Sequence, residues 1–441
     1  MTTIKEFFQR SRLAGICLAF GLTAALTACG GMQQSNLPQP AAPSGSGAPM
    51  ATRSAARGSV SYKIVQLPTL GGLEDFANWI NDRGWVAGAA DLAGGRHEHA
   101  FLWRDDKIYD LGTLGGDNSL AWPVNDAGTV AGDSVTSTDD PLRENFCHFN
   151  IDGKSEFTKH TCSGYVLLHE VMTALPTLGG NNSSVFGLNN DGVIVGAAET
   201  GTKDQGCSAP QKVDFEAAVW EPHAHKVRQL PPFAGDAVGG ALAINASGDV
   251  VGGSGICAPI SPAIGAHALL WRHGKPQNLG GFGGKTSNLA YDINDRGHIV
   301  GFSDLKGDTA THAFLWEDGK ITDLGTLPGD VFSFAFGINE RDQVVGESCD
   351  ASFNCRAFIW EDGVMRDLNS LVSGSSLALT LAESINNKGA ITGIAYDPST
   401  GGVPAYVAIP NHGSLDAAPR SKIALPANVR AGLQTLARTR F

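Results

Sequence analysis

The stretch AYDINDRGHIVG (residues 290–301), followed by HAFLWEDGKITDL (residues 312–324), decides the fold of this chain. Short apolar runs alternate here with Asn-Asp-x-Gly and Asp-Gly, which are strong hairpin signals because such turns need positive φ angles that Gly and Asn tolerate. The pattern predicts strands over residues 290–294, 298–301, 312–316 and 320–324. Four strands joined in this way form one small antiparallel sheet.

The same pattern recurs seven times, and an Asn marks the end of the first strand in each copy. These residues are Asn81, Asn125, Asn189, Asn245, Asn294, Asn339 and Asn386. A repeat of about 45 residues with four short strands has the size of one β-propeller blade. We therefore predict an all-β fold, a seven-bladed β-propeller of four-stranded blades.

The two ends of the repeat array complement each other. The run YKIVQL (residues 62–67) matches a fourth strand, whereas the seventh repeat ends after its third strand, near Pro410. We predict that the N-terminal strand serves as the outer strand of the last blade and so closes the ring without an unpaired edge. Residues 59–410 then form the propeller. Pro123 falls in a first strand, where an edge facing the central channel tolerates it.

The N-terminal region is predicted to be an export signal and a tether. Lys5, Arg10 and Arg12 precede an uncharged apolar run over residues 13–26, which is too short to span a membrane. The sequence LTAC (residues 26–29) looks like the lipobox of bacterial lipoproteins, in which the Cys becomes the acylated N-terminus; an ordinary signal peptide is the alternative. We expect a signal peptide over residues 1–28, lipidation at Cys29 and a flexible tether over residues 29–58.

The sequences HAFLW (residues 99–103 and 312–316), DLGTLGG (residues 110–116) and INDRG (residues 293–297) carry a family resemblance. The chain resembles the bacterial extracellular HAF repeats over residues 62–410. Glu216 and Arg356 depart from it, because they replace the His of the motif. The resemblance implies an exported repeat protein and brings no established activity. With Gly30 after the Cys, the lipoprotein pattern implies export to the outer membrane.

Charge and cysteine content agree with an exported domain. The formal net charge is −12 and there is no basic tract, which argues against nucleic-acid binding. Outside the signal an even number of cysteines remains, which favours disulfides in an exported chain. Cys349 and Cys355 share one short loop and form the expected pair; the other disulfide candidates are Cys147 and Cys162, in one insertion, and Cys207 and Cys257, in equivalent loops of adjacent repeats.

The insertions are confined to one face of the predicted propeller. They lie between second and third strands, over residues 133–163, 197–215, 253–265 and 347–355. Long loops on a rigid scaffold are where binding usually occurs, although insertions also accumulate as tolerated drift. We therefore place the site on this face.

The loops that cross between blades reach the same face near the axis. Their polar residues are our ligand-binding candidates: Asp75, Asp117, Asn118, Asn182, Asp236, Lys285, Asn288 and Asp330. Carboxylates and amides suit a cation or the hydroxyls of a carbohydrate, but Asp and Asn also form turns without any ligand. Lys285 is the single basic member and would orient an acidic ligand.

Metal, cofactor and catalytic signatures are weak. His99, His267 and His312 are equivalent, but third strands in neighbouring blades are roughly 15 Å apart, far beyond ~2 Å metal–ligand bonds, so no metal site is predicted. No cofactor is predicted either, although a structural cation at the channel mouth is compatible with the acidic loops. There is no nucleophile elbow, zinc motif or phosphate loop. The best place for a general acid–base pair is the insertion of the second repeat and its surroundings, with three His and two Glu: His148, His160, His169, Glu144 and Glu170.

These features favour a non-catalytic, exported and membrane-tethered repeat protein. We expect a monomer that binds a glycan or an envelope or secreted protein through its loop-rich face. The alternatives are a polysaccharide lyase or hydrolase acting at the same face, and a passive structural protein of the envelope. In the tail over residues 411–441, Val429, Leu433 and Leu436 have helical spacing; a short helix there would pack on the propeller, contact an anionic surface or fray.

Overall fold

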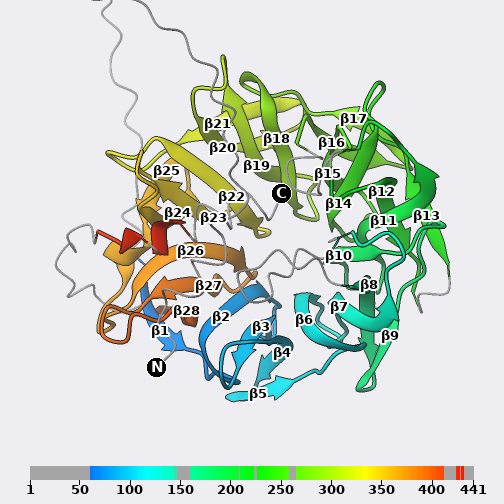
Figure 1. The fold of residues 1–441 in the computed structure, drawn as a ribbon. Helices are drawn as coiled ribbons and strands as arrows, with labels where there is room; N and C mark the ends of the chain where they lie inside the picture. Colours follow the sequence, from blue (N-terminus) through cyan, green and yellow to red (C-terminus); the bar gives the residue numbers. More distant parts are fainter. Residues whose placement is uncertain are drawn as a thin grey trace, which may run out of the picture.

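The repeats form the blades of a seven-bladed β-propeller (Figure 1). The structure is a computed structural model that describes residues 60–144, 146, 159–207, 209–222, 226–257, 265–411, 424–427 and 429–431. The predicted signal, Cys29 and the tether lie outside these residues. In each blade the strands pair antiparallel and in order, from the first at the channel to the fourth at the rim.

The first three blades contain twelve strands. Blade 1 has β2 (Gly71–Ile80), β3 (Val86–Leu92), β4 (Glu98–Arg104) and β5 (Lys107–Asp110). Blade 2 has β6 (Gly115–Val124), β7 (Val130–Asp139), β8 (His160–Leu168) and β9 (Val171–Ala174). Blade 3 has β10 (Ser183–Leu188), β11 (Ile194–Lys203), β12 (Val213–Trp220) and β13 (Val227–Leu230).

The next three blades repeat this order. Blade 4 has β14 (Val238–Ile244), β15 (Val250–Gly255), β16 (His267–Arg272) and β17 (Lys275–Asn278). Blade 5 has β18 (Gly283–Ile293), β19 (Ile299–Leu305), β20 (Thr311–Glu317) and β21 (Lys320–Gly325). Blade 6 has β22 (Phe332–Ile338), β23 (Val344–Cys349), β24 (Cys355–Glu361) and β25 (Val364–Asp367), followed by the 3₁₀ helix η2 (Leu368–Leu371).

Blade 7 joins the two ends of the array, as predicted. It has β26 (Ala378–Ile385), β27 (Ile391–Tyr396) and β28 (Ala405–Asn411), and its outer strand is β1 (Ser61–Gln66). β1 pairs antiparallel with β28 from Ser61 opposite Asn411 to Gln66 opposite Tyr406. Unfolding of the propeller therefore has to separate strands that are more than 300 residues apart in sequence.

A backbone contact explains the Gly at the third position of each second strand. First strands carry an irregularity, for example between Ala290 and Asp292 in β18. It brings a carbonyl oxygen against the neighbouring Gly: a Cβ on Gly301 would lie 2.0 Å from the Leu289 oxygen. Gly88 would meet the Phe76 oxygen at 1.9 Å in the same way. Glycine is required here because nothing larger fits.

Apolar side chains fill the spaces between blades and much of the central channel. Third-strand aromatic residues such as Phe314 and Trp271 are at most 1% exposed. Aromatic residues of first strands meet between neighbouring blades, as in the Trp122–Phe186 and Tyr291–Phe336 pairs with ring centroids 5.9 and 5.1 Å apart. Packing between neighbouring blades therefore forms much of the core of the propeller.

The described part of the C-terminal tail packs on the propeller. Residues 427 and 429–431 are helical, and Leu425 and Val429 are buried against the Cys349–Cys355 disulfide. The backbone N–H of Leu425 donates to Oδ1 of Asn354 at 3.2 Å. Among the described residues, no helix is long and apolar enough to cross a membrane.

Candidate functional site

The two faces of the propeller differ in construction. The turn face carries the tight turns between first and second strands and between third and fourth strands. The loop face carries the loops between second and third strands and the crossings between blades. The predicted candidates lie on the loop face, on six of the seven blades.

On the turn face, the seven repeat Asn residues form a closed ring of hydrogen bonds. Each Nδ2 donates to the backbone oxygen of the equivalent Asn in the next blade, from Asn81 to Asn125 at 2.9 Å and finally from Asn386 back to Asn81 at 2.8 Å. The five bonds between them, from Asn125 through Asn339, measure 3.1–3.2 Å. This ring joins every blade to its neighbours near the axis.

The same side chains also shape the turns. Oδ1 of Asn189 accepts from the backbone N–H groups of Asp191 and Val193 at 3.1 and 3.0 Å. The sequence analysis identifies these Asn residues as markers of the repeat but does not predict the ring of hydrogen bonds. The presence of Asn in all seven copies was the signal that could have revealed it. A cavity of about 160 Å³ at this mouth is lined by residues of all seven blades.

A second set of residues, less buried than the first, follows the Asn ring by one position. The backbone N–H of Asp82 donates to Oδ1 of Asp126, and that of Asp126 to Oδ1 of Asn190. The set is Asp82, Asp126, Asn190, Asp295, Glu340 and Asn387, and Ala246 interrupts it in blade 4. These residues line the cavity and make its mouth acidic.

The side chains of three amide candidates on the loop face form hydrogen bonds with neighbouring strands and loops. Asn118 accepts at Oδ1 from the backbone N–H of Glu98 in the preceding blade at 3.0 Å. Asn182 accepts from the N–H of Cys162 in the same way, at 2.8 Å. Asn288 donates to the Ala266 oxygen at 3.2 Å and accepts from the Ser303 hydroxyl at 2.7 Å. Their described partners are protein groups, and ligand binding by them stays a prediction.

Two acidic candidates are paired with basic side chains of their own blades. Oδ2 of Asp236 lies 2.8 Å from Nδ1 of His267. Oδ2 of Asp330 accepts from Arg356 at 2.7 Å, and its side chain is 0% exposed. Asp117 and Lys285 are exposed and remain accessible.

Asp75 has a different environment from the other candidates. Its side chain is buried, and neither carboxylate oxygen has a hydrogen-bond partner in the described structure. Burial, and secondarily the nearby Asp91 carboxylate, raises the pKa of Asp75 to about 8. An ionised carboxylate in this position is costly unless a cation or a proton neutralises it.

The His residues of the HAF motif form hydrogen bonds with carboxylates of their own blades. His99 lies 2.9 Å from Asp110, and Nδ1 of His312 lies 3.0 Å from Asp323. Arg356, which departs from the motif, bridges Asp367 and Asp330 at 3.0 and 2.7 Å. Its longer, forked side chain makes the same kind of pair and adds a second one.

Glu216, the other departure from the motif, lacks a basic partner among its described contacts. It is buried, and its Oε2 has no hydrogen-bond partner there. Burial, followed by repulsion from Asp214, raises the pKa of Glu216 to about 8. The side chain is therefore mostly protonated at neutral pH.

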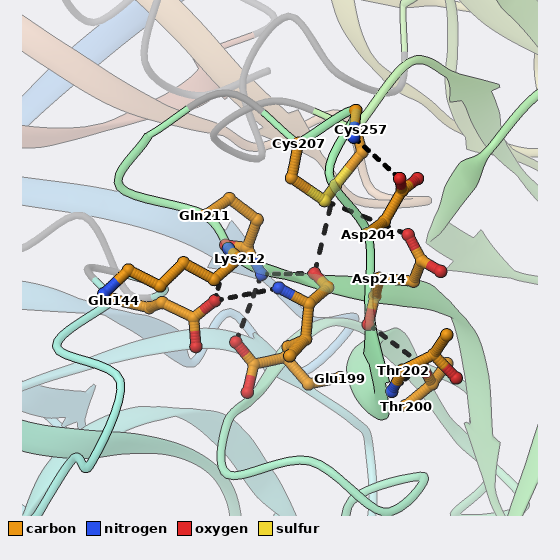
Figure 2. The surroundings of a disulfide bond; sticks show 12 residues. Glu144, Glu199, Thr200, Thr202, Asp204, Cys207, Gln211, Lys212, Asp214 and Cys257 are labelled. Atoms are coloured by element: carbon orange, nitrogen blue, oxygen red, sulfur yellow. Dashed lines mark hydrogen bonds between the residues drawn. A yellow bond between two sulfur atoms is a disulfide. The ribbon is translucent and has the colours of Figure 1, made fainter.

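Two disulfides fix the insertions of the loop face. Cys349 and Cys355 are bonded, as predicted, across the short loop of blade 6. Cys207 and Cys257 link the loops of blades 3 and 4, and Figure 2 shows them beside Asp204 and Asp214. Cys162 is also disulfide-bonded, whereas Cys147 lies outside the described residues.

A buried carboxyl cluster joins the insertion of blade 2 to blade 3 (Figure 2). Oε1 of Glu144 accepts from the backbone N–H groups of Lys212 and Val213 at 2.5 and 3.1 Å. Glu199 accepts from the side chains of Asn182 and Gln211 at 3.0 and 3.2 Å. Burial, then repulsion from Glu199, raises the pKa of Glu144 to about 7.

The expectation of an acid–base pair in the insertion of the second repeat is wrong for His160 and His169. His160 begins β8 at the loop face, whereas His169 lies in the tight turn after β8, at the turn face. A nine-residue strand separates them by roughly 30 Å, so they cannot act on one substrate bond. His160 pairs instead with exposed Asp139 at 3.3 Å. His148 lies outside the described residues.

On the turn face, one further cluster of side chains has ligand-type atoms. Nδ1 of His298 lies 2.8 Å from Oδ1 of Asp342 and 3.6 Å from Oε1 of Glu317. The guanidinium of Arg296 contacts the same Asp342 oxygen. A resident cationic side chain already neutralises this cluster.

No protein-family model and no curated protein matches the chain, so the HAF resemblance stays a prediction. Among solved structures, it is similar to a puromycin hydrolase (12% identity, TM-score 0.45), covering 81% of this chain and 58% of the hydrolase. It is also similar to a gluconolactonase from Xanthomonas campestris, with 9% identity and a TM-score of 0.36; the match covers 82% of this chain and 94% of the gluconolactonase. A six-bladed fucose-binding lectin from Aleuria aurantia has 8% identity and a TM-score of 0.31; the match covers 81% of this chain and 98% of the lectin. These likenesses are ones of fold.

Proposed function

We propose that this chain is an exported, lipid-anchored and non-catalytic propeller that binds an envelope or secreted protein through its loop face. The contrast between the two faces carries the proposal. The turn face is uniform and is closed by the Asn ring, whereas insertions and disulfides gather on the loop face. The signal, the lipobox and the HAF resemblance support export.

The loop face is held rigid in a way that favours recognition. The Cys207–Cys257 bond ties two blades together. Glu144 anchors the insertion of blade 2 to the backbone of Lys212 and Val213 in blade 3. Loops that are ordered before binding lose less conformational entropy when a partner docks. Such cross-linking would have little use in insertions that were merely tolerated.

Exposed side chains favour a protein over a glycan as the partner. Leu73, Ile256 and Val331 are 56%, 68% and 38% exposed, and all three lie at the loop face. These residues are aliphatic and lack the polar handle of the aromatic residues that combine apolar and hydrogen-bonding contacts. Aliphatic side chains are exposed on the turn face as well, so this observation bears on the class of partner and does not select the face.

The test compares the two faces. Cells producing the protein are treated with a cross-linker that does not enter the cytoplasm, and the captured partner is purified for binding measurements. We expect the triple variant Leu73→Ser, Ile256→Ser and Val331→Ser to bind at least about tenfold more weakly. The control carries Val171→Ser and Val364→Ser, which are 62% and 48% exposed on the turn face, and should bind like the wild type.

Other ligand classes give other outcomes. The protein is mixed with a panel of envelope polysaccharides, and both retention and new chain ends are measured. Retention without new ends would replace the protein partner by a glycan, and new reducing or unsaturated ends would show a lyase or hydrolase. If the loop-face variant and the turn-face control lost partner binding equally, the loop face would not be the binding surface.

A further inference from the structure

A short part of the C-terminal tail covers an apolar surface at the loop-face ends of blades 6 and 7. We call the described residues of this part, 424–427 and 429–431, the C-terminal segment. The surface under it, which we call the tail-binding surface, consists of Phe332, Cys349, Phe353, Cys355, Ala378 and Tyr396. Leu425 and Val429 pack on this surface and are 5% and 2% exposed. Two aliphatic side chains therefore anchor the segment to two blades.

One side chain of blade 6 orients the segment. Asp350 accepts from the backbone N–H of Asn354 at 2.9 Å and, through Oδ2, from its Nδ2 at 2.9 Å. These bonds fix the Asn354 amide, whose Oδ1 accepts the backbone N–H of Leu425 at 3.2 Å. Within the segment, the N–H of Arg430 donates to the Pro426 oxygen at 3.0 Å, which is an α-helical bond. The surface thus holds one helical turn by two apolar anchors and one polar contact.

Blades 2 and 3 cover the same end of the propeller in another way. Phe146, in the insertion of blade 2, packs against Phe215 of blade 3 with ring centroids 5.6 Å apart. Blades 6 and 7 have only short connections between their second and third strands, residues 350–354 and 397–404. Their apolar surface is covered instead by a segment that belongs to no blade. Such a cover leaves without separating any strand pair.

The contact between the segment and the propeller is shallow. Among the described residues of the segment, only Leu425 and Val429 are buried, whereas Ala424 and Ala427 are exposed. Each residue that becomes ordered on docking loses conformational entropy, which opposes the contact. Segments with few buried contacts open at a free energy far below that of global unfolding. The tail-binding surface is therefore exposed at intervals while the blades stay folded.

Charge distinguishes the segment from the surface that it covers. Residues 411–441 carry five basic side chains and one acidic side chain, whereas the whole chain has a formal net charge of −12. A basic chain is attracted to an acidic protein, and salt screens this attraction beyond about 10 Å. A competitor for the surface thus combines aliphatic side chains with positive charge.

We propose that the tail-binding surface is a docking site for a basic helical turn with two aliphatic anchors, and that the C-terminal segment occupies it until a partner of this chemistry displaces it. The proposal rests on the loop face being the docking surface and adds its regulation. Val331, which is 38% exposed, donates its backbone N–H to the Cys349 oxygen at 2.8 Å. A partner that contacts Val331 therefore meets the segment. Helices seated by a few aliphatic side chains are a recurring mode of peptide recognition.

The test uses the whole protein and, as the probe, a fluorescently labelled synthetic peptide of residues 421–432. In the double variant Leu425→Ser and Val429→Ser, the segment no longer holds the surface. Fluorescence polarisation should show that this variant binds the peptide at least about tenfold more tightly than the wild type, in which the tethered segment competes. The control variant Ala424→Ser and Ala427→Ser changes exposed residues of the same segment and should bind like the wild type.

Limited digestion with trypsin gives a readout that needs no ligand. The bond after Arg430 should be cut at least about tenfold faster in the double variant than in the wild type or the control, because cleavage follows the open population. Equal rates would mean that the segment does not hold the surface. No binding of the peptide by the double variant, or equal binding by the double variant and the wild type, would overturn the docking site.

The partner captured through the loop face separates this proposal from the proposed function. It should bind the double variant at least about tenfold more tightly than the wild type. Equal binding would remove the regulation by the segment and leave binding through the loop face intact. Failure of the loop-face function itself is reported by the triple variant of Leu73, Ile256 and Val331, which leaves the C-terminal segment unchanged.

Discussion

Asparagine recurs at the end of the first strand because one short side chain does two things there. Its amide oxygen fixes the turn that follows, and its amide N–H₂ reaches the next blade, as Asn189 shows. Asp would lack the donor, and Ser would lack the reach. The residue pattern was readable from the sequence, but the ring was not, because it depends on how neighbouring blades are placed.

Asn189→Ala tests the contribution of one ring member. The variant leaves the N–H groups of Asp191 and Val193 without their acceptor and removes the bond to blade 4. We expect the free energy of unfolding to fall by about 2–3 kcal/mol in urea titrations.

The adjacent residue provides the control. Asn190 is exposed and belongs to the second set, in which blade 4 already carries Ala246. Asn190→Ala should cost less than about 1 kcal/mol. If the two variants lost similar amounts of free energy of unfolding, the buried ring would contribute no more to stability than the second set.

At the scale of elements, the strands follow local signals closely, and the loops do not. The four strands expected for the fifth repeat appear as β18–β21, although β18 begins at Gly283, before the apolar run. Its extension depends on pairing with β19, where Gly283 meets Leu305. The loop-face site was less predictable: Asp236 and Asp330 were candidates by position, but their basic partners are set by strand register.

The two disulfides between described cysteines should differ in their effect on stability. Cys207–Cys257 has a sequence separation of 50 and Cys349–Cys355 one of 6. Because the stabilisation by a cross-link grows with the length of the closed loop, we expect losses of about 4 and about 2.5 kcal/mol respectively. Double Cys→Ser variants of each pair, compared by urea unfolding, test this order. A larger loss for the short loop would contradict it.

For the molecule as a whole, the seven-bladed ring and its closure by β1 could be predicted from the sequence. The number of repeats gives the number of blades, and the incomplete seventh repeat leaves a place for the N-terminal strand. The buried carboxyl groups could not be predicted, since burial emerges only when blades pack. Burial is the first cause of a raised folded-state pKa, to about 7 or 8, in six of these groups: Asp75, Glu98, Asp133, Glu144, Glu216 and Asp292.

Stability should therefore decrease as the pH rises. With folded-state pKa values above the unfolded ones, the folded protein keeps protons that the unfolded chain releases between about pH 4 and pH 8. Urea unfolding in chelator-containing buffer should show the free energy of unfolding falling from pH 5 to pH 8. Glu216→Gln should show a shallower fall, because it removes one of the six groups. A flat or rising profile would refute the prediction.

The direction of β1 determines at which face a chain anchored at Cys29 would enter the propeller. Ser61 lies beside Asn411 at the turn face, and the strand runs from there towards the loop face. A chain anchored at Cys29 would thus join the propeller from the side of the Asn ring. The regular face would be the one nearest the point of attachment, and the cross-linked loops would lie at the far end of β1, on the order of 20 Å further along the chain. A partner that docks on these loops would then approach the end of the molecule opposite its attachment point.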